Sequence, residues 1–373
     1  MKDSRLDQLA KLMLEYSIKA KPQEIVLLNT DITALPLAKA IMLRANEMGV
    51  FVVPEITTQE TTRLAKEGLH TDDEGASERF LEKKTSWGLA SAQDIACRIN
   101  LRAYQNDQEL SAIPPAIHNM EGSIAKPLQD LLIDERRWVL FEYPTPGQAQ
   151  RAGIAYEKYF DFVFDVSNVD YAKMAEDVKP LVSLMERTDR VRIVGPETDL
   201  RFSIKNIPII PCCGEANIPD GEVFTAPVKD SINGTLKFNT PTLYWGKIMT
   251  GVKLEFENGK IIKATADTNE ETLNKILDSD EGARYVGEFA LGINPLLREP
   301  FLNTLFDEKI CGSFHFTPGK AYAEADNGNT STIHWDMVCI QRPEYGGGEI
   351  WFDDVLVRKD GMFILPELTG LNP

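Results

Sequence analysis

The first half of the chain alternates short apolar runs with longer amphipathic segments, and this alternation limits the possible folds more than any other feature of the sequence. Residues 3–20 carry an apolar stripe at helical spacing, and residues 31–49 repeat that pattern before a closing glycine. The apolar runs, each long enough for one buried strand, are EIVLLNT (24–30), VFVVPEIT (50–57), DIACRINL (94–101) and RRWVLFEYP (136–144). Strands that alternate with helices favour a mostly parallel sheet with helices on its faces. We therefore expect an α/β domain over residues 1–188.

The second half of the chain shows the strict polar–apolar alternation of half-buried strands. Its clearest feature is the stretch 252–266, which is centred on Asn258-Gly259, the strongest short hairpin signal. Further predicted elements are strands at 190–195 and 198–204, a helix at about 268–278, and a hairpin over 349–364 that turns at Asp360-Gly361. The pattern predicts a β-rich α+β domain over residues 189–373.

Composition and charge argue against several classes of protein. With 373 residues and 43% hydrophobic content, the chain can bury two cores of ordinary size. It has no 18-residue apolar run, so no membrane span is expected, and its charged N-terminus lacks the apolar block of a signal peptide. The net charge of −17 disfavours nucleic acid, and no glycine-rich nucleotide loop follows the predicted strands. The five cysteines include no Cys-x-x-Cys pair, which favours a reduced, cytoplasmic protein.

Acidic residues and histidines gather in apolar surroundings in the second half of the chain. The whole chain has four histidines, and two of them, His315 and His334, lie within twenty residues of each other. Glu222 stands in PDGEVFTAP, Glu288 stands in YVGEFALGIN, and Asp336 follows His334 in STIHWDM. If that last stretch is a strand, the imidazole and the carboxylate point to the same side. Taken singly, each residue has an ordinary explanation as a solvated carboxylate or a hydrogen-bonded core histidine.

As a set, these five residues indicate metal binding. A buried carboxylate is costly unless it is paired or bound to a cation. Three carboxylates and two imidazoles satisfy one another poorly, but they can satisfy two divalent ions well. Imidazole and carboxylate ligands together suit zinc, cobalt or manganese. Two such ions lower the pKa of a shared water and polarise a carbonyl, so the sequence predicts metal-assisted hydrolysis.

Four motifs, in order along the chain, resemble those of the aminopeptidase T / aminopeptidase S family of M29-type metallopeptidases. They are NIPDGEVFTAP, GEFALGIN, HFTPGKAY and STIHWDM, and with ETDLRFSI ahead of them they span about residues 198–337. The resemblance implies an α/β domain that supports a chamber or a dimer, followed by a β-rich catalytic domain that holds two divalent metal ions. It also implies a homodimeric aminopeptidase that releases N-terminal amino acids from peptides with free N-termini through a water activated by two metals.

The resemblance also implies roles for individual residues. The metal ligands that it implies are Glu222, Glu288, His315, His334 and Asp336. Glu288 is further expected to act as general base and Tyr322 to donate to the developing oxyanion, with simple aromatic packing as the alternative for Tyr322. Some members use an acidic residue ahead of the third motif, and Glu308 in LFDEK is the candidate, although its distance from His315 differs. The stretch from Tyr322 to His334 is shorter than in better-known members.

Two other functions use the same residues. The first is a different di-metal amide hydrolase, such as an amidase or a deacylase, which would accept N-blocked substrates as well as free N-termini. The second is a non-catalytic metal-binding protein, which would bind metal tightly and turn over no peptide. All five ligand-type positions carry ligand-type residues, and this argues against a decayed site.

Overall fold

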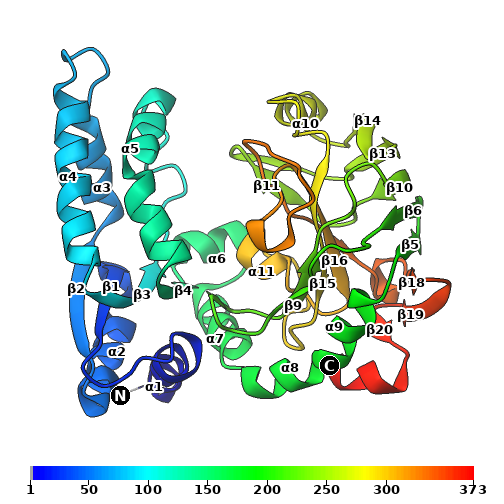
Figure 1. Ribbon diagram of the computed structural model, residues 1–373, viewed down its shortest axis with the longest axis horizontal. Helices are drawn as coiled ribbons and strands as arrows, with labels where there is room; N and C mark the ends of the chain where they lie inside the picture. The colour runs from blue at the N-terminus through cyan, green and yellow to red at the C-terminus, as the bar shows by residue number, and fades with distance from the viewer. Residues whose placement is uncertain (1–2) are drawn as a thin grey trace. The chain divides into compact units, whose positions relative to one another are not determined.

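The chain forms two compact units, as a computed structural model of the protein shows for residues 3–373. The first unit comprises Met1–Asn168 and Gly214–Pro219, and the second comprises Val169–Cys213 and Asp220–Pro373. Figure 1 shows the helices and strands of each unit. The functional division expected at residue 188, with a supporting domain before it and a catalytic domain after it, stays a prediction.

The first unit is built on one parallel sheet, which confirms the expected α/β architecture. Its five strands lie in the order β2-β1-β3-β4-β8. Their bounds are Ile25–Asp31 for β1, Phe51–Thr57 for β2, Ile95–Arg102 for β3, Arg137–Glu142 for β4 and Asn217–Ile218 for β8. The last strand, β8, belongs to the separate segment Gly214–Pro219 and pairs with β4 at the edge of the sheet.

Helices connect the strands of the first unit, as the apolar spacing predicts. Their bounds are Ser4–Lys11 for α1, which continues as a π-helical turn over Leu12–Ser17, Leu35–Met48 for α2, Gln59–Glu67 for α3, Ala76–Ala92 for α4, Pro115–Asp134 for α5, Pro146–Ala152 for α6 and Tyr156–Ser167 for α7. Helix α2 ends where predicted, at Gly49, whose φ of 68° is the left-handed conformation that a C-terminal glycine adopts at low cost. Leu27 and Ile95 of the sheet pack in one buried cluster with Ala92 and Leu132, so the ends of α4 and α5 cover the sheet there.

The second unit contains an eight-stranded antiparallel sheet and begins with two helices, α8 (Tyr171–Asp177) and α9 (Lys179–Glu186). The strand order is β14-β13-β10-β6-β5-β18-β19-β20. The bounds are Arg190–Gly195 for β5, Thr198–Ser203 for β6, Asn233–Lys237 for β10, Lys253–Glu257 for β13, Lys260–Thr265 for β14, Glu349–Phe352 for β18, Val355–Lys359 for β19 and Met362–Phe363 for β20. The hairpin predicted at Asn258-Gly259 is confirmed, and both of its turn residues have positive φ.

The predicted single hairpin over 349–364 is wrong in part, because the segment makes two hairpins. The chain turns first at Asp353-Asp354 and then at the expected Asp360-Gly361. Both residues of the first turn have positive φ, which aspartate tolerates better than most residues. The Asp353 carboxylate also accepts hydrogen bonds from the backbone N–H groups of Asp189 and Arg190, which hold the turn in place.

A second sheet of the same unit has five antiparallel strands in the order β17-β16-β15-β9-β7. Its bounds are Ile210–Cys212 for β7, Glu222–Thr225 for β9, Val286–Gly292 for β15, Ser313–Pro318 for β16 and Met337–Ile340 for β17. Every residue of β9, β15, β16 and β17 is buried, so both faces of the sheet are covered. The unit is completed by the β11–β12 hairpin (Thr242–Tyr244 and Lys247–Met249), by α11 (Thr304–Asp307) and by α10 (Glu270–Leu277), which confirms the helix predicted at 268–278.

The strand predicted for STIHWDM is also corrected by the structure. Strand β17 begins only at Met337, and His334 makes a single bridge with Gly319 instead of a continuous ladder. The backbone N–H of Thr332 donates to the Asp280 carboxylate at 2.7 Å, so a side chain takes the place of a strand partner.

The two sheets of the second unit pack through an aromatic cluster. Phe202 of the eight-stranded sheet lies 5.0 Å, centroid to centroid, from Phe289 of β15 and 5.3 Å from Phe316 of β16. Because successive residues of a strand point to opposite faces, Glu288 and His315 point away from this core. None of the helices within residues 3–373 is both long and apolar enough to cross a membrane.

Candidate metal centre

Register places the candidate ligands of three strands on one face of the five-stranded sheet. Glu222 lies opposite Gly292, His315 lies opposite Ala290, and Glu288 lies opposite Thr317. All of these positions share the side chain direction of Glu288. Strand pairing therefore brings together residues that are far apart in sequence, and the apolar core fills the other face.

The first group of candidate ligands is Glu222, Glu288 and His315. His315 Nε2 lies 2.8 Å from Glu288 Oε1 and 3.6 Å from Glu222 Oε2. All three side chains are buried, and one ligand atom from each lies within 4.8 Å of the others. The geometry is compact enough for one cation to contact all three residues.

The second group is Glu288, His334 and Asp336. His334 Nε2 lies 3.2 Å from Asp336 Oδ1 and 3.4 Å from Glu288 Oε2. Although His334 is not in a regular strand, its side chain and that of Asp336 converge as predicted, and Thr317 Oγ1 donates to Asp336 Oδ1 at 2.7 Å. Glu288 belongs to both groups and joins them.

Hydrogen bonds on the far side of each imidazole orient both histidines in the same way. His315 Nδ1 lies 3.2 Å from the backbone oxygen of Glu308, and His334 Nδ1 lies 2.8 Å from that of Lys320. A carbonyl can only accept, so each Nδ1 carries its proton and donates. Each Nε2 therefore faces the carboxylates, which is the tautomer and orientation of a metal-ligating histidine.

The electrostatics of the site favour additional positive charge. Burial alone would lower the pKa of each histidine, but the facing carboxylates raise the pKa of His315 to about 10 and that of His334 to about 12. Burial raises the pKa of Glu222 to about 8. For Asp336 burial acts in the same direction, but His334 outweighs it and lowers the pKa below its usual range. Carboxylates that hold protons on a buried and a partly buried imidazole would also hold a cation in their place.

Unpartnered oxygen atoms show that the donor set fits a divalent ion. Glu222 Oε2 and Glu288 Oε2 are buried and have no hydrogen-bond partner. Unsatisfied buried carboxylate oxygens are costly, and a cation removes that cost. Carboxylates with imidazoles are ligands that zinc, cobalt and manganese accept. A third group, Cys212, Asp220 and Glu222, shares Glu222 with the first.

Glu308 and Tyr322 lie near these groups without belonging to them. Burial raises the pKa of Glu308, whose carboxylate contacts the Lys309 ammonium and feels the charges of Asp336 and His315. Tyr322 is 45% exposed, and its ring centroid lies 4.5 Å from that of His334. Tyr322 is thus partly exposed beside a member of the second group.

Sequence reasoning missed Lys309 and Thr317. Lys309 is fully buried, and its Nζ lies 3.5 Å from Glu222 Oε1. In the sequence it sits in the charged run Asp307–Lys309, which reads as a solvated surface. The apolar residues Ile310 and Cys311 directly follow Lys309, and both are buried. Their presence in the sequence could have indicated that the chain enters the core at Lys309.

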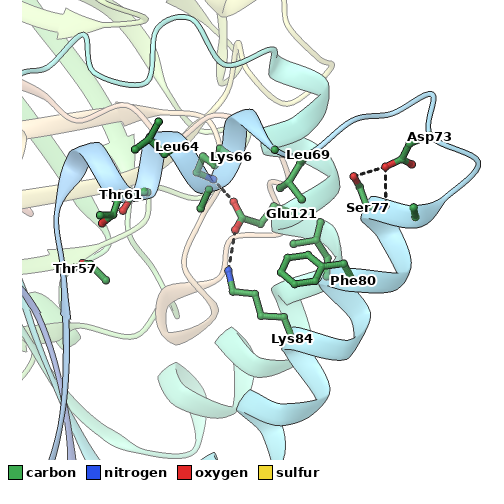
Figure 2. A pocket seen from close by; sticks show the side chains of 15 residues that line it. Thr57, Thr61, Leu64, Lys66, Leu69, Asp73, Ser77, Phe80, Lys84 and Glu121 are labelled. Carbon is green, nitrogen blue, oxygen red and sulfur yellow. Dashed lines mark hydrogen bonds and ion pairs between the residues drawn. The ribbon is translucent and has the colours of Figure 1, made fainter.

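A separate pocket of about 750 Å³ lies in the first unit among residues of α3, α4 and α5 (Figure 2). Its charged side chains pair with one another. Lys66 and Lys84 both contact Glu121, and Ser77 Oγ donates to Asp73 at 2.6 Å. Figure 2 shows Glu121 between the two lysines and Ser77 beside Asp73, so these charged groups are already paired within the pocket.

Known proteins resemble this chain over almost its whole length. The family model described as thermophilic metalloprotease (M29) matches residues 2–363. Aminopeptidase 2 of Geobacillus stearothermophilus is 27% identical in an alignment 414 residues long, gaps included, that covers 96% of this chain and 95% of that protein. Aminopeptidase T of Thermus thermophilus is 25% identical, over 89% of this chain and 91% of that protein. The solved structure titled wild-type AmpT from Thermus thermophilus has the same fold, with a TM-score of 0.78 at 22% identity and coverage of 97% of this chain and 99% of that one.

Proposed function

Because this chain belongs to the M29 family of thermophilic metalloproteases, we propose that it is a metal-dependent aminopeptidase that releases N-terminal amino acids from peptides. The observation that carries the proposal is the pair of ligand groups joined by the buried Glu288, in which Glu222 Oε2 and Glu288 Oε2 have no hydrogen-bond partner. Such a site is costly to maintain in a folded protein unless cations bind there.

We assign two divalent ions, zinc, cobalt or manganese, to the two groups. Glu222, His315 and Glu288 would hold one, and Glu288, His334 and Asp336 would hold the other. When bound, these ions supply a Lewis acid for the substrate carbonyl and acidify water. The Glu308 carboxylate interacts electrostatically with His315 of the first group and Asp336 of the second. It is a candidate for an additional contact with the ions.

The chain's own residues would then bind the peptide and move protons. Glu288 belongs to both groups, and we propose that its carboxylate takes a proton from water and returns it to the leaving amine. We propose that Tyr322 O–H donates to the oxygen of the first peptide carbonyl, where negative charge develops; the nearness of its ring to His334 supports this role. The free α-amine of the substrate would bind to a carboxylate of the site when it is protonated, or to a metal ion when it is neutral.

Metal dependence with a requirement for a free N-terminus is the central test. We expect the purified protein to hydrolyse aminoacyl-p-nitroanilides, to lose activity after chelation, and to regain it when Zn²⁺, Co²⁺ or Mn²⁺ is added back. N-acetylated versions of the same substrates should react at least about 100-fold more slowly, because the amine contact is lost. Equal rates on both substrates would favour an amidase or a deacylase instead.

A matched variant tests the role of Glu288 in the same assay. Glu288→Gln keeps the shape of the side chain and removes its basicity, and we expect a fall in kcat of about 100-fold or more. If the variant binds metal normally and hydrolyses the substrate at the parent rate, Glu288 is not the base.

We further propose a cytoplasmic homodimer. All five cysteines are free thiols, which suits a reducing compartment. Strand β2 lies at the edge of its sheet and exposes Phe51, Val53 and Ile56. An apolar edge strand is a surface that a second copy of the chain can cover.

A further inference from the structure

A fully buried ammonium group stands beside one of the two candidate metal groups. The Lys309 side chain has no exposed surface, and its Nζ contacts Glu308 Oε1 and lies 3.5 Å from Glu222 Oε1. Two carboxylates face this ammonium in a buried setting, and an ammonium taken out of water without such partners is strongly disfavoured. Lys309 is therefore a fixed positive charge within reach of a candidate ligand oxygen.

The backbone holds this lysine in place. Its N–H donates to the backbone oxygen of Phe306 at 3.0 Å, and its own carbonyl accepts from the N–H of Asn294 at 3.1 Å. The residue lies between α11 and β16, the strand that carries His315. The side chain cannot leave the carboxylates without burying an unpaired charge elsewhere or opening this segment.

The two candidate groups differ in their relation to Lys309. Glu222 is the member of the first group that pairs with it. In the second group, the ion pairs found among residues 3–373 join Glu288 and Asp336 to histidines alone. The imidazoles are themselves candidate ligands, whereas the ammonium of Lys309 is a cation beside Glu222 that belongs to neither ligand group.

We propose that Lys309 is a resident cation that makes the Glu222–Glu288–His315 group the weaker of the two metal sites, so that divalent ions bind in a fixed order. The first ion enters at Glu288–His334–Asp336, and the second enters beside Glu222 against the repulsion of the ammonium. The inference rests on the proposed function, because it assumes that both groups bind metal.

The physical reason is competition for the same carboxylate. A positive charge a few ångströms from a ligand oxygen repels a divalent ion strongly in a buried site, where screening is weak. Lys309 also satisfies one oxygen of Glu222 when the second ion is absent. The ammonium thus stabilises the state with one ion and lowers the affinity for the next.

The test is a calorimetric titration of chelator-stripped protein with Mn²⁺ and, separately, Zn²⁺, with bound metal counted by elemental analysis. The parent protein should bind two ions in two steps whose dissociation constants differ by at least roughly tenfold. Lys309→Met keeps the length of the side chain and removes its charge, and it should tighten the weaker step by roughly tenfold or more. Lys263→Met, which removes an exposed lysine paired with Glu255, is the matched control and should leave both steps unchanged.

Two further variants identify the steps and keep the test valid if Lys309→Met folds poorly. Glu222→Gln should remove only the weaker step, and Asp336→Asn should remove the tighter one. The inference is overturned if the parent sites bind with equal affinity, if folded Lys309→Met titrates like the parent, or if Glu222→Gln removes the tighter step. Failure of the parent protein to bind any metal would instead contradict the proposed function.

Discussion

The chemistry of the site depends on the position of single residues within their strands. In β15, Glu288 points to the candidate metal centre and its neighbour Phe289 points into the aromatic core. A shift of register by one residue would exchange the two faces and bury the carboxylate among phenylalanines. The backbone acceptors of Glu308 and Lys320 fix the remaining variable, which is the direction of the two imidazoles.

Tyr322 gives the residue-scale prediction. We expect Tyr322→Phe to lower kcat by about 100-fold with little change in KM, because one hydrogen-bond donor to the developing oxyanion is lost. The ring itself remains, so its packing against His334 and Phe224 is kept. Steady-state kinetics with an aminoacyl-p-nitroanilide measures the effect. An unchanged kcat would leave Tyr322 only a packing role.

At this scale, the sequence predicts the polar residues of the site better than their neighbours. Glu222, Glu288, His315, His334 and Asp336 were selected as carboxylates or imidazoles in apolar surroundings, and the structure brings them together. Their roles as ligands stay predictions. Lys309 and Thr317 were not predicted. Lys309 contacts Glu222 and Thr317 contacts Asp336, and spacing along the chain does not reveal contacts between residues so far apart in sequence.

At the scale of elements, the segment that carries His334 is held by a short backbone bridge to residues 318–320 and, just before it, by the side chain of Asp280. The Asp280 carboxylate accepts hydrogen bonds from Ser331 Oγ at 2.9 Å and from Thr332 N and Oγ1 at 2.7 and 2.6 Å. It also accepts from the backbone N–H groups of Gly282 and Ala283. One aspartate therefore ties the turn after α10 to the residues just before His334.

Asp280 gives a prediction about stability and pH. Burial alone would raise the pKa of Asp280, but the hydrogen bonds from Thr332 and Ser331 lower it to about 2. The folded-state pKa lies below the unfolded-state value of about 3.9, so the carboxylate stabilises the fold above about pH 4, and this contribution is lost as the pH falls towards 2. Asp280→Asn should be less stable than the parent at pH 6, and the gap should shrink at pH 3.

Urea unfolding at the two pH values measures this gap. Glu281→Gln is a suitable control, because Glu281 is the exposed carboxylate next to Asp280 in the chain. A gap for Asp280→Asn that stays constant or widens on acidification would contradict the assignment.

Helices, strands and turns were predictable where residues close together in the sequence determine the local structure by themselves. The Asn258-Gly259 turn needs only two residues that tolerate positive φ, and both are visible in the sequence. The turn at Asp353-Asp354 depends also on the backbone N–H groups of Asp189 and Arg190, more than 160 residues away. STIHWDM has strand-like alternation, but its partner at Thr332 is the Asp280 side chain, so periodicity alone could not define its structure.

At the scale of the whole molecule, the exposed edge strand β2 gives the prediction about assembly. Phe51, Val53 and Ile56 are 61%, 47% and 50% exposed on a strand with a free edge. If this edge joins two copies, the double variant Val53→Lys, Ile56→Lys should convert the dimer to a monomer, because charged lysines oppose edge pairing.

Light scattering coupled to size exclusion measures the molar mass of both proteins. Ile262→Lys, at a position that is 57% exposed in the other unit, is the control and should leave the mass unchanged. A parent protein that is monomeric, or a double variant that remains a dimer, would show that β2 does not carry a dimer interface.

The late arrival of β8 has a consequence for synthesis and for protein engineering. Since β8 pairs with β4 but belongs to the segment Gly214–Pro219, the first sheet lacks its last strand until the ribosome has made that segment. A fragment that stops at Asn168 would leave the edge of β4 bare and open to aggregation. Anyone wishing to express the first unit alone would need to graft residues 214–219 behind residue 168 through a linker.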